Sequence, residues 1–282
     1  MSGNELIGRM NINLEGRRNL LVARSAERRI NVRKSAGLWL PPIEIFTAST
    51  IWVIPEDVIN VFVAVVGAGG GAGANGSVNN RRGGGGGAGA LVLCENYDVS
   101  EKETIEITIG NGGSGGVNGQ RGENGENTVF DGIVALGGGG GGGSEFALVG
   151  ALNGGSGGGG GVRGNTVGSG GQSVQESIEG FLIYGHNGND GRYAHSGVVI
   201  RGGGGGGAHA APIENIGGEG KIILDKEYAK GGNSFSNFSG HGSTDGSNGQ
   251  PNTGSGGNVS SEIDGTGGSG GSGVVILIYS NK

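Results

Sequence analysis

The chain has 282 residues, of which 73 are glycine, and its formal net charge is -6 at pH 7. This acidic balance argues against general nucleic-acid binding, and the single cysteine, Cys94, excludes an intrachain disulfide. Hydrophobic residues make up 33% of the chain and gather in compact runs, which excludes a flexible linker over its whole length. No apolar run approaches the roughly 20 residues of a membrane span, and no secretory signal opens the chain. We therefore expect synthesis in a cytoplasm and no membrane insertion.

The first 40 residues are basic. They hold eight Lys and Arg against three Glu, a net of +5, which leaves -11 for the rest of a chain whose total is -6. We divide the chain into a basic N-terminal attachment arm, residues 1–44, and a glycine-rich domain, residues 45–282. Pro41 and Pro42 mark the end of the arm, because this pair cannot sit inside a helix or a central strand. A solvated charged face is the alternative interpretation of the arm.

The glycine-rich domain opens with strand signals, "IEIFTAS" and then "TIWVIPEDVINVFVAVVG". In the second run the odd-numbered apolar residues of 59–65 share one face and residues 62, 64 and 66 share the other. A strand that is apolar on both faces is buried on both faces. The closing "GVVILIYS" has the same character. We expect these first and last core strands to pair or to be neighbours.

Two hairpins are predicted between these strands. The first joins "ALVLCENY" to "TIEITIG" through the polar "DVSEKE". The second is "TVFDGIVAL", turning at Asp131 and Gly132, a dipeptide typical of tight hairpins. No segment has a helical period of 3.6, so no α-helix is expected after residue 45.

Four glycine runs lie between the strands. Ordering a residue costs roughly 1–2 kcal/mol, so ordered runs need many compensating contacts. Polyproline-II helices have three residues per turn and no internal hydrogen bonds, so their backbone groups bond to neighbours instead. We predict that the runs adopt this conformation as polyglycine-II helices and pack side by side. The alternative is that they are flexible loops. The runs are residues 83–87, 137–143, 157–161 and 202–207, and their central structural glycines are Gly85, Gly140, Gly159 and Gly204.

The inserts between glycine runs carry the candidate binding residues. Residues 172–201 and 233–252 combine spaced aromatic residues with Gly, Ser and Asn, a composition typical of adaptable binding loops. "FLIY" and "KIILDKEY" are better interpreted as further core strands. The candidate binding residues, which would contact a receptor if the chain is an adhesin, are Tyr193, His195, Phe235, Phe238 and His241.

Catalytic and metal motifs are weak. "GGSGG" occurs at Ser114, Ser156 and Ser269, but a nucleophile elbow needs a following helix, and none is expected here. The four histidines lack the short spacing of metal ligands. We predict no enzymatic activity, no metal site and no cofactor.

Residues 45–282 resemble the glycine-rich domain of bacteriophage tail-fibre and virion-surface proteins. The resemblance rests on four stretches in the same order: "WVIPEDVINVFVAVVGAGGGAG", "IEITIGNGGSGG", "GENGENTVFDGIVALGGGGGGG" and "GGSGGSGVVILIYS". The chain is also loosely similar to the tip adhesins of T-even-like phages, in which packed polyglycine-II helices carry receptor-binding loops. With the residue patterns, this leads us to expect an all-β fold: a β-sandwich-like core with packed polyglycine-II helices, surface loops and an N-terminal extension.

The resemblance implies a virion protein, a host receptor-binding adhesin of a tail fibre. The alternative is a structural or decoration protein of capsid, collar or tail without receptor contact. The implied partners are other virion proteins, through residues 1–44, and a host outer-membrane protein or polysaccharide. The chain would be either a homotrimer or a monomer on a trimeric fibre.

Overall fold

The computed structural model describes residues 29–30, 41–78, 80–145, 148–194, 199–235 and 246–279. No helix occurs among these residues, and the paired strands run antiparallel, so the prediction of an all-β fold is confirmed. The proposed boundary between arm and domain falls inside a strand, Ile43–Phe46. The rest of the arm, apart from residues 29–30 and 41–42, lies outside the described residues.

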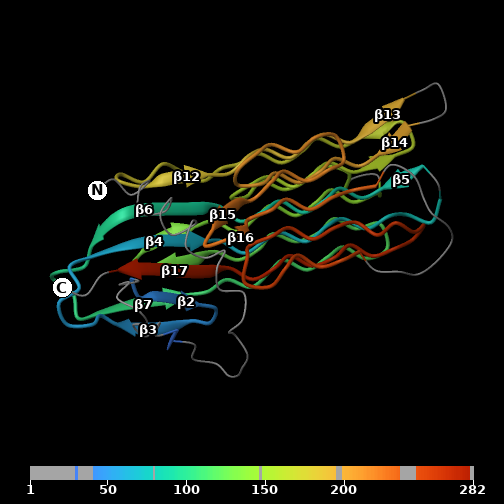
Figure 1. The fold of residues 1–282 in the computed structure, drawn as a ribbon. Coiled ribbons are helices and arrows are strands. Elements are labelled where there is room, and N and C mark those ends of the chain that lie inside the picture. The colour runs from blue at the N-terminus through green and yellow to red at the C-terminus, as the bar shows by residue number, and fades with distance from the viewer. Residues whose placement is uncertain are drawn as a thin grey trace.

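Two sheets form a β-sandwich at one end of the molecule (Figure 1). The larger has six strands in the order β1 (Arg29–Ile30), β2 (Ile43–Phe46), β17 (Val274–Tyr279), β4 (Asn60–Val66), β6 (Leu91–Asp98) and β12 (Leu182–Tyr184). The smaller has four strands in the order β3 (Thr50–Val53), β7 (Thr104–Thr108), β8 (Thr128–Phe130) and β9 (Ile133–Ala135).

The first and last core strands are neighbours, as predicted, because β17 pairs with β4 along its whole length. Val61, Val63 and Val65 of β4 face the smaller sheet, where Trp52 and Phe130 are buried with them. These side chains form the interior of the sandwich. The prediction of a sandwich-like core is therefore confirmed.

The opposite face of the larger sheet is also covered. Phe62 and Val66 of β4 pack there with Ile223 and Tyr228 of a hairpin formed by β15 (Lys221–Ile223) and β16 (Lys226–Tyr228). This second core explains why β4 and β17 are apolar on both faces. "KIILDKEY" and "FLIY" both supply strands, since β12 pairs with β6.

One predicted hairpin forms and the other does not. Strands β8 and β9 pair around Asp131 and Gly132, which have φ angles of 50° and 78°, as a type I′ turn requires. The hairpin joining β6 to β7 was a wrong prediction, because β6 pairs with β4 and β12 while β7 pairs with β3 and β8. The connection between them crosses from one sheet to the other, and Val99 within it is buried in the sandwich core.

The glycine runs are ordered and packed against one another. In residues 84–90, every third backbone N–H donates to the same neighbouring run, which is the period of a threefold polyglycine-II helix. This segment donates to residues 136–142, 203–206 and 254–257, and it accepts from residues 67–73, 156–159 and 232. Six segments therefore surround it, and hydrogen bonds between backbones replace a side-chain core.

The four central glycines lie within this packing, and each is buried. A Cβ built on any of them would overlap a carbonyl oxygen of a neighbouring segment. The overlapped oxygens belong to Gly232 for Gly85, Gly122 for Gly140, Gly203 for Gly159 and Ile216 for Gly204. Only a residue without a side chain fits at this separation of backbones.

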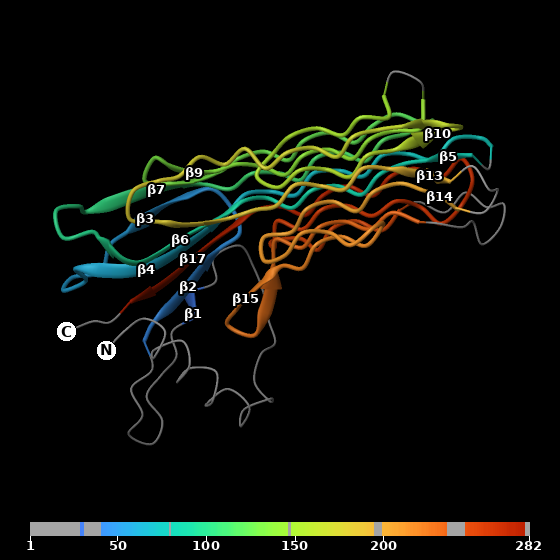
Figure 2. The ribbon, with the colours of Figure 1, turned by 90° about the horizontal axis from the view of Figure 1, so that it is seen from above.

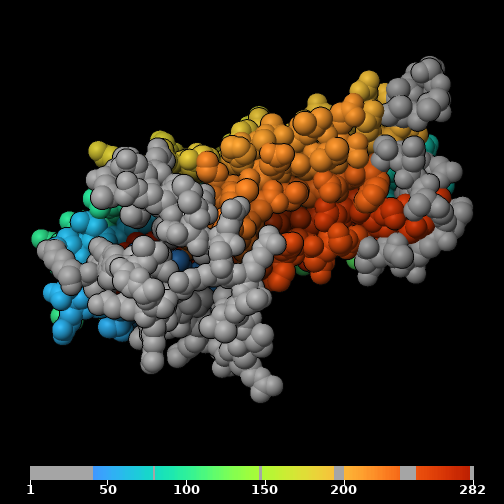
Figure 3. Space-filling model, viewed as in Figure 1, coloured from blue at the N-terminus to red at the C-terminus, as the bar shows by residue number. Residues whose placement is uncertain are grey.

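The glycine bundle extends from the sandwich to an end made of short hairpins (Figure 2). The later runs form a continuous side of the bundle in the space-filling view, coloured orange to red (Figure 3). The strands at the far end are β5 (Arg81–Arg82), β10 (Val162–Arg163), β11 (Thr166–Val167), β13 (Arg192–Ala194) and β14 (Val199–Arg201).

Candidate functional site

We call the end of the bundle opposite the sandwich the tip, and define it as β5, β10, β11, β13 and β14 together with the turn of residues 213–216. β13 lies beside β11, and β14 lies beside β5. The tip is where the runs reverse direction, and there the chain departs from glycine. Side chains with chemical function therefore gather at this end.

Two of the predicted receptor-binding residues lie at or next to the tip. Tyr193 is half-buried in β13 and pairs with Ile200 of β14. Phe235 is half-buried and follows Ser234, whose hydroxyl donates a hydrogen bond to Gly83 O beside β5. The remaining three, His195, Phe238 and His241, lie outside the described residues.

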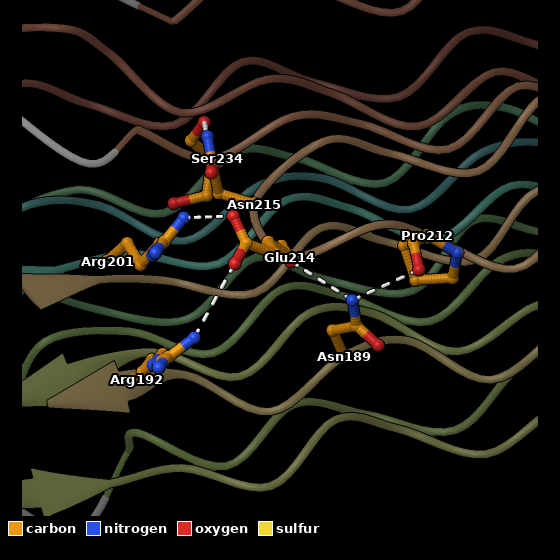
Figure 4. Close-up of polar contacts among 7 residues, drawn as sticks. All are labelled: Asn189, Arg192, Arg201, Pro212, Glu214, Asn215 and Ser234. Carbon is orange, nitrogen blue, oxygen red and sulfur yellow. Dashed lines mark hydrogen bonds and ion pairs between the residues drawn. The ribbon is translucent and has the colours of Figure 1, made fainter.

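A cluster that the sequence analysis missed lies beside Tyr193. Glu214 accepts hydrogen bonds from Arg192 Nη1, at 3.5 Å, and from Arg201 Nη1 (Figure 4). Arg192 and Arg201 are cross-strand partners in the β13–β14 hairpin. Neighbouring residues of a strand point to opposite faces, so Tyr193 lies on the other face of this hairpin. No short motif links these three charged residues, because Glu214 comes 13 residues after Arg201.

Glu214 is held in a fixed position by its surroundings. Ile213 and Ile216 pair around it through mutual backbone hydrogen bonds of 3.0 and 2.9 Å. Its carbonyl oxygen accepts from Asn189 Nδ2 at 3.1 Å and from Gly204 N at 2.9 Å. Its φ angle of 55° lies in the left-handed region, which glycine adopts at little cost and Glu rarely adopts.

These residues line a pocket of about 330 Å³. Segment 185–191 contributes an asparagine and the carboxylate of Asp190, and the hairpin and the turn contribute the two arginines and Glu214. Its lining consists of Asn189, Asp190, Gly191, Arg192, Arg201, Gly202 and Glu214. Two cations face two anions, so the pocket is strongly polar but carries no net formal charge.

A second, similar trio lies elsewhere on the tip. Glu145 pairs with Arg81 at 2.7 Å and with Arg163 at 3.7 Å, and these arginines are cross-strand partners of β5 and β10. None of its members lines the pocket. Burial lowers the pKa of neighbouring Arg82 to about 10, which leaves its guanidinium charged at neutral pH. The tip thus presents several fixed cations.

The described part of the chain contains no group of three or more His, Cys, Asp or Glu residues placed to hold a metal ion. Within the same residues, no helix is long and apolar enough to cross a membrane. The arrangement at the tip can form many directional hydrogen bonds to a polar ligand.

Comparison with known proteins gives one assignment. No curated protein matched the chain. Residues 46–280 match a family described as a glycine-rich domain, and this region includes β4, β17 and the glycine runs between them. Because the match covers most of the chain, the protein belongs to the glycine-rich domain family.

Proposed function

We propose that this protein is a receptor-binding protein of a bacteriophage tail fibre or virion surface, and that its tip contacts the host cell. The observation that carries the proposal is that the sandwich and the tip lie at opposite ends of the molecule. The sandwich holds β1 and β17, whereas the strands β5, β13 and β14 of the tip lie at the other end of the bundle (Figure 1). Tyr193 and the charged residues Arg192 and Arg201 belong to this tip.

The bundle suits this role because it is a rigid spacer. The strands β13 and β14 of the tip continue directly into hydrogen-bonded segments, residues 185–191 before β13 and residues 202–207 after β14. Binding groups that are already ordered lose less conformational entropy on binding. A small tip offers limited contact area, and several copies on one particle would raise the effective affinity.

We assign different partners to the N-terminal arm and to the tip. Residues 1–44 would attach the chain to other virion proteins, because residues 1–40 carry a net charge of +5, opposite in sign to the acidic remainder. The tip would bind a host outer-membrane protein or polysaccharide. The protein would act as a homotrimer or as a monomer on a trimeric fibre.

The test uses the fluorescently labelled full chain and a panel of Gram-negative bacterial strains, with binding measured by flow cytometry. We expect binding to a subset of strains, and about tenfold or greater weakening for Tyr193→Ala and Phe235→Ala. The control is Ile222→Ala, which removes an exposed apolar side chain, 66% accessible, from β15 away from the tip. All variants must retain the melting temperature of the wild type.

Absence of binding to every strain, or equal binding by the tip variants, would favour a structural or decoration protein of the virion instead. In either case a chain lacking residues 1–28 should fail to join particles. Normal incorporation of that shortened chain would remove the proposed role of the arm.

A further inference from the structure

The charged pocket at the tip has features that hairpin anchoring alone does not require. Arg201 Nε is shielded from solvent and has no hydrogen-bond partner among the described residues. A buried donor without an acceptor is unfavourable, and an incoming acceptor would remove the penalty. Arg201 is also a lining residue of the pocket, and a small movement of its side chain would bring this Nε within reach of an acceptor on a ligand there.

Glu214 is the second such feature. It occupies a left-handed position in a two-residue turn, although glycine is abundant in this chain and would fit there without cost. Other described non-glycine residues share this conformation, for example Leu224 and Ala229, so the backbone alone does not mark a site. Glu214 lines the pocket and is distinguished by its carboxylate, which accepts from both arginines.

We infer that this pocket binds an uncharged, hydroxyl-rich saccharide unit of the host surface, with Arg192, Arg201, Glu214 and Asp190 as its hydrogen-bonding groups. This inference rests on the proposed function and names the class of its receptor. The opposed charges balance, so the pocket favours neither an acid nor a base. A hydroxyl group both donates and accepts, and it can therefore bridge a guanidinium and a carboxylate.

Position and size agree with this class of ligand. The carboxylate of Asp190 is fixed by Gly170 N, at 2.8 Å, and the carboxylate of Glu214 by the two arginines. Directional groups held in advance are what specific polar recognition needs. A volume of about 330 Å³ lies at the small end of ligand pockets and suits about one or two sugar rings. Ile213 and Ile216, 73% and 59% exposed, offer apolar surface on either side of Glu214 in the turn.

The experiment is saturation-transfer NMR on the full chain with glucose, galactose, mannose, rhamnose and N-acetylglucosamine, and with glucuronic and galacturonic acid. We expect transfer to at least one neutral sugar and weaker transfer to its acid. Glu214→Gly should lose about tenfold or more in affinity for that sugar, because a charged hydrogen-bonding group is removed. Its melting temperature should fall only modestly, because glycine relieves the left-handed backbone while the ion pairs to Arg192 and Arg201 are lost.

Glu145→Gln is the matched control. It alters the other Arg–Glu–Arg trio of the tip and should leave saccharide binding unchanged. The inference is overturned if no sugar shows transfer, if only the acids do, or if Glu214→Gly binds as well as the wild type. Attachment to cells without any saccharide binding would reject the saccharide while leaving the receptor-binding proposal standing. Saccharide binding without attachment to cells would reject the receptor-binding proposal and leave the saccharide site standing.

Discussion

At the scale of single residues, the bundle is intolerant of side chains. Gly140 lies in run 137–143, and a Cβ there would overlap the carbonyl oxygen of Gly122. We expect Gly140→Ala to reduce stability by about 2–3 kcal/mol, as overpacking does, and to lower the melting temperature by roughly 5–10 °C. Differential scanning fluorimetry measures the change.

Gly150→Ala is the control for this substitution. The nearest heavy atom to a Cβ at Gly150 is Ser169 Oγ, at 3.9 Å, so the added methyl group meets open space. Its effect should stay within about 0.5 kcal/mol. Equal melting temperatures for Gly140→Ala and Gly150→Ala would mean that the runs do not pack as described.

Residues that act through long-range contacts could not be predicted from the sequence. Close packing around Gly140, by contrast, could be predicted, because its run consists of glycine alone. Glu214 and Arg192 are 22 positions apart and belong to no recognisable motif, so their ion pair is visible only in the fold. Tyr193 and Phe235 were singled out by composition alone, which cannot tell which face of a hairpin a side chain occupies.

At the scale of elements, hairpins with a turn signal were predictable and longer connections were not. Asp131 and Gly132 specify a type I′ turn locally. The residues between β6 and β7 suit a hairpin and a crossover between sheets equally, and the buried side chain of Val99 decides for the crossover. Local residues fix a tight turn, whereas a longer connection is fixed by what packs around it.

The order of glycine runs in the bundle also could not be predicted, because identical runs have no side chains that would distinguish one neighbour from another. One pair of asparagines does indicate which run lies beside it. Asn124 Oδ1 accepts from Gly140 N, at 2.9 Å, and Asn127 Oδ1 accepts from Gly137 N, at 3.0 Å. The spacing of three in "GENGEN" matches the helical period, so both amides reach the same neighbouring run. Asparagines spaced by three therefore help to set the register.

In the β8–β9 turn, the conformational cost of replacing a glycine can be measured apart from any steric overlap. Gly132 has a φ of 78°, yet nothing lies within 4 Å of a Cβ built on it. We expect Gly132→Ala to cost about 1–2 kcal/mol through the left-handed backbone alone. Gly132→Asn should cost less, because Asn tolerates this conformation. Urea denaturation measures both, and an Asn variant as unstable as the Ala variant would contradict the explanation.

At the scale of the whole molecule, two kinds of interior are joined end to end. The sandwich buries apolar side chains such as Phe130 and Leu277, whereas the bundle buries peptide groups bonded to peptide groups. Net stabilisation by one hydrogen bond is about 1 kcal/mol, similar to the cost of ordering a residue. The bundle therefore depends on close contacts on all sides, including weak Cα–H···O contacts, and on being anchored to the sandwich.

This division predicts an unusual heat capacity of unfolding. Exposure of apolar surface raises the heat capacity and exposure of polar surface lowers it, and globular proteins reach about 12–15 cal/mol/K per residue. Unfolding of the bundle exposes mostly peptide groups of glycine, so the value per residue should fall clearly below that range. Scanning calorimetry at several pH values, with the unfolding enthalpy plotted against melting temperature, gives the slope. A slope within the ordinary range would mean that apolar burial dominates the bundle as it dominates the sandwich.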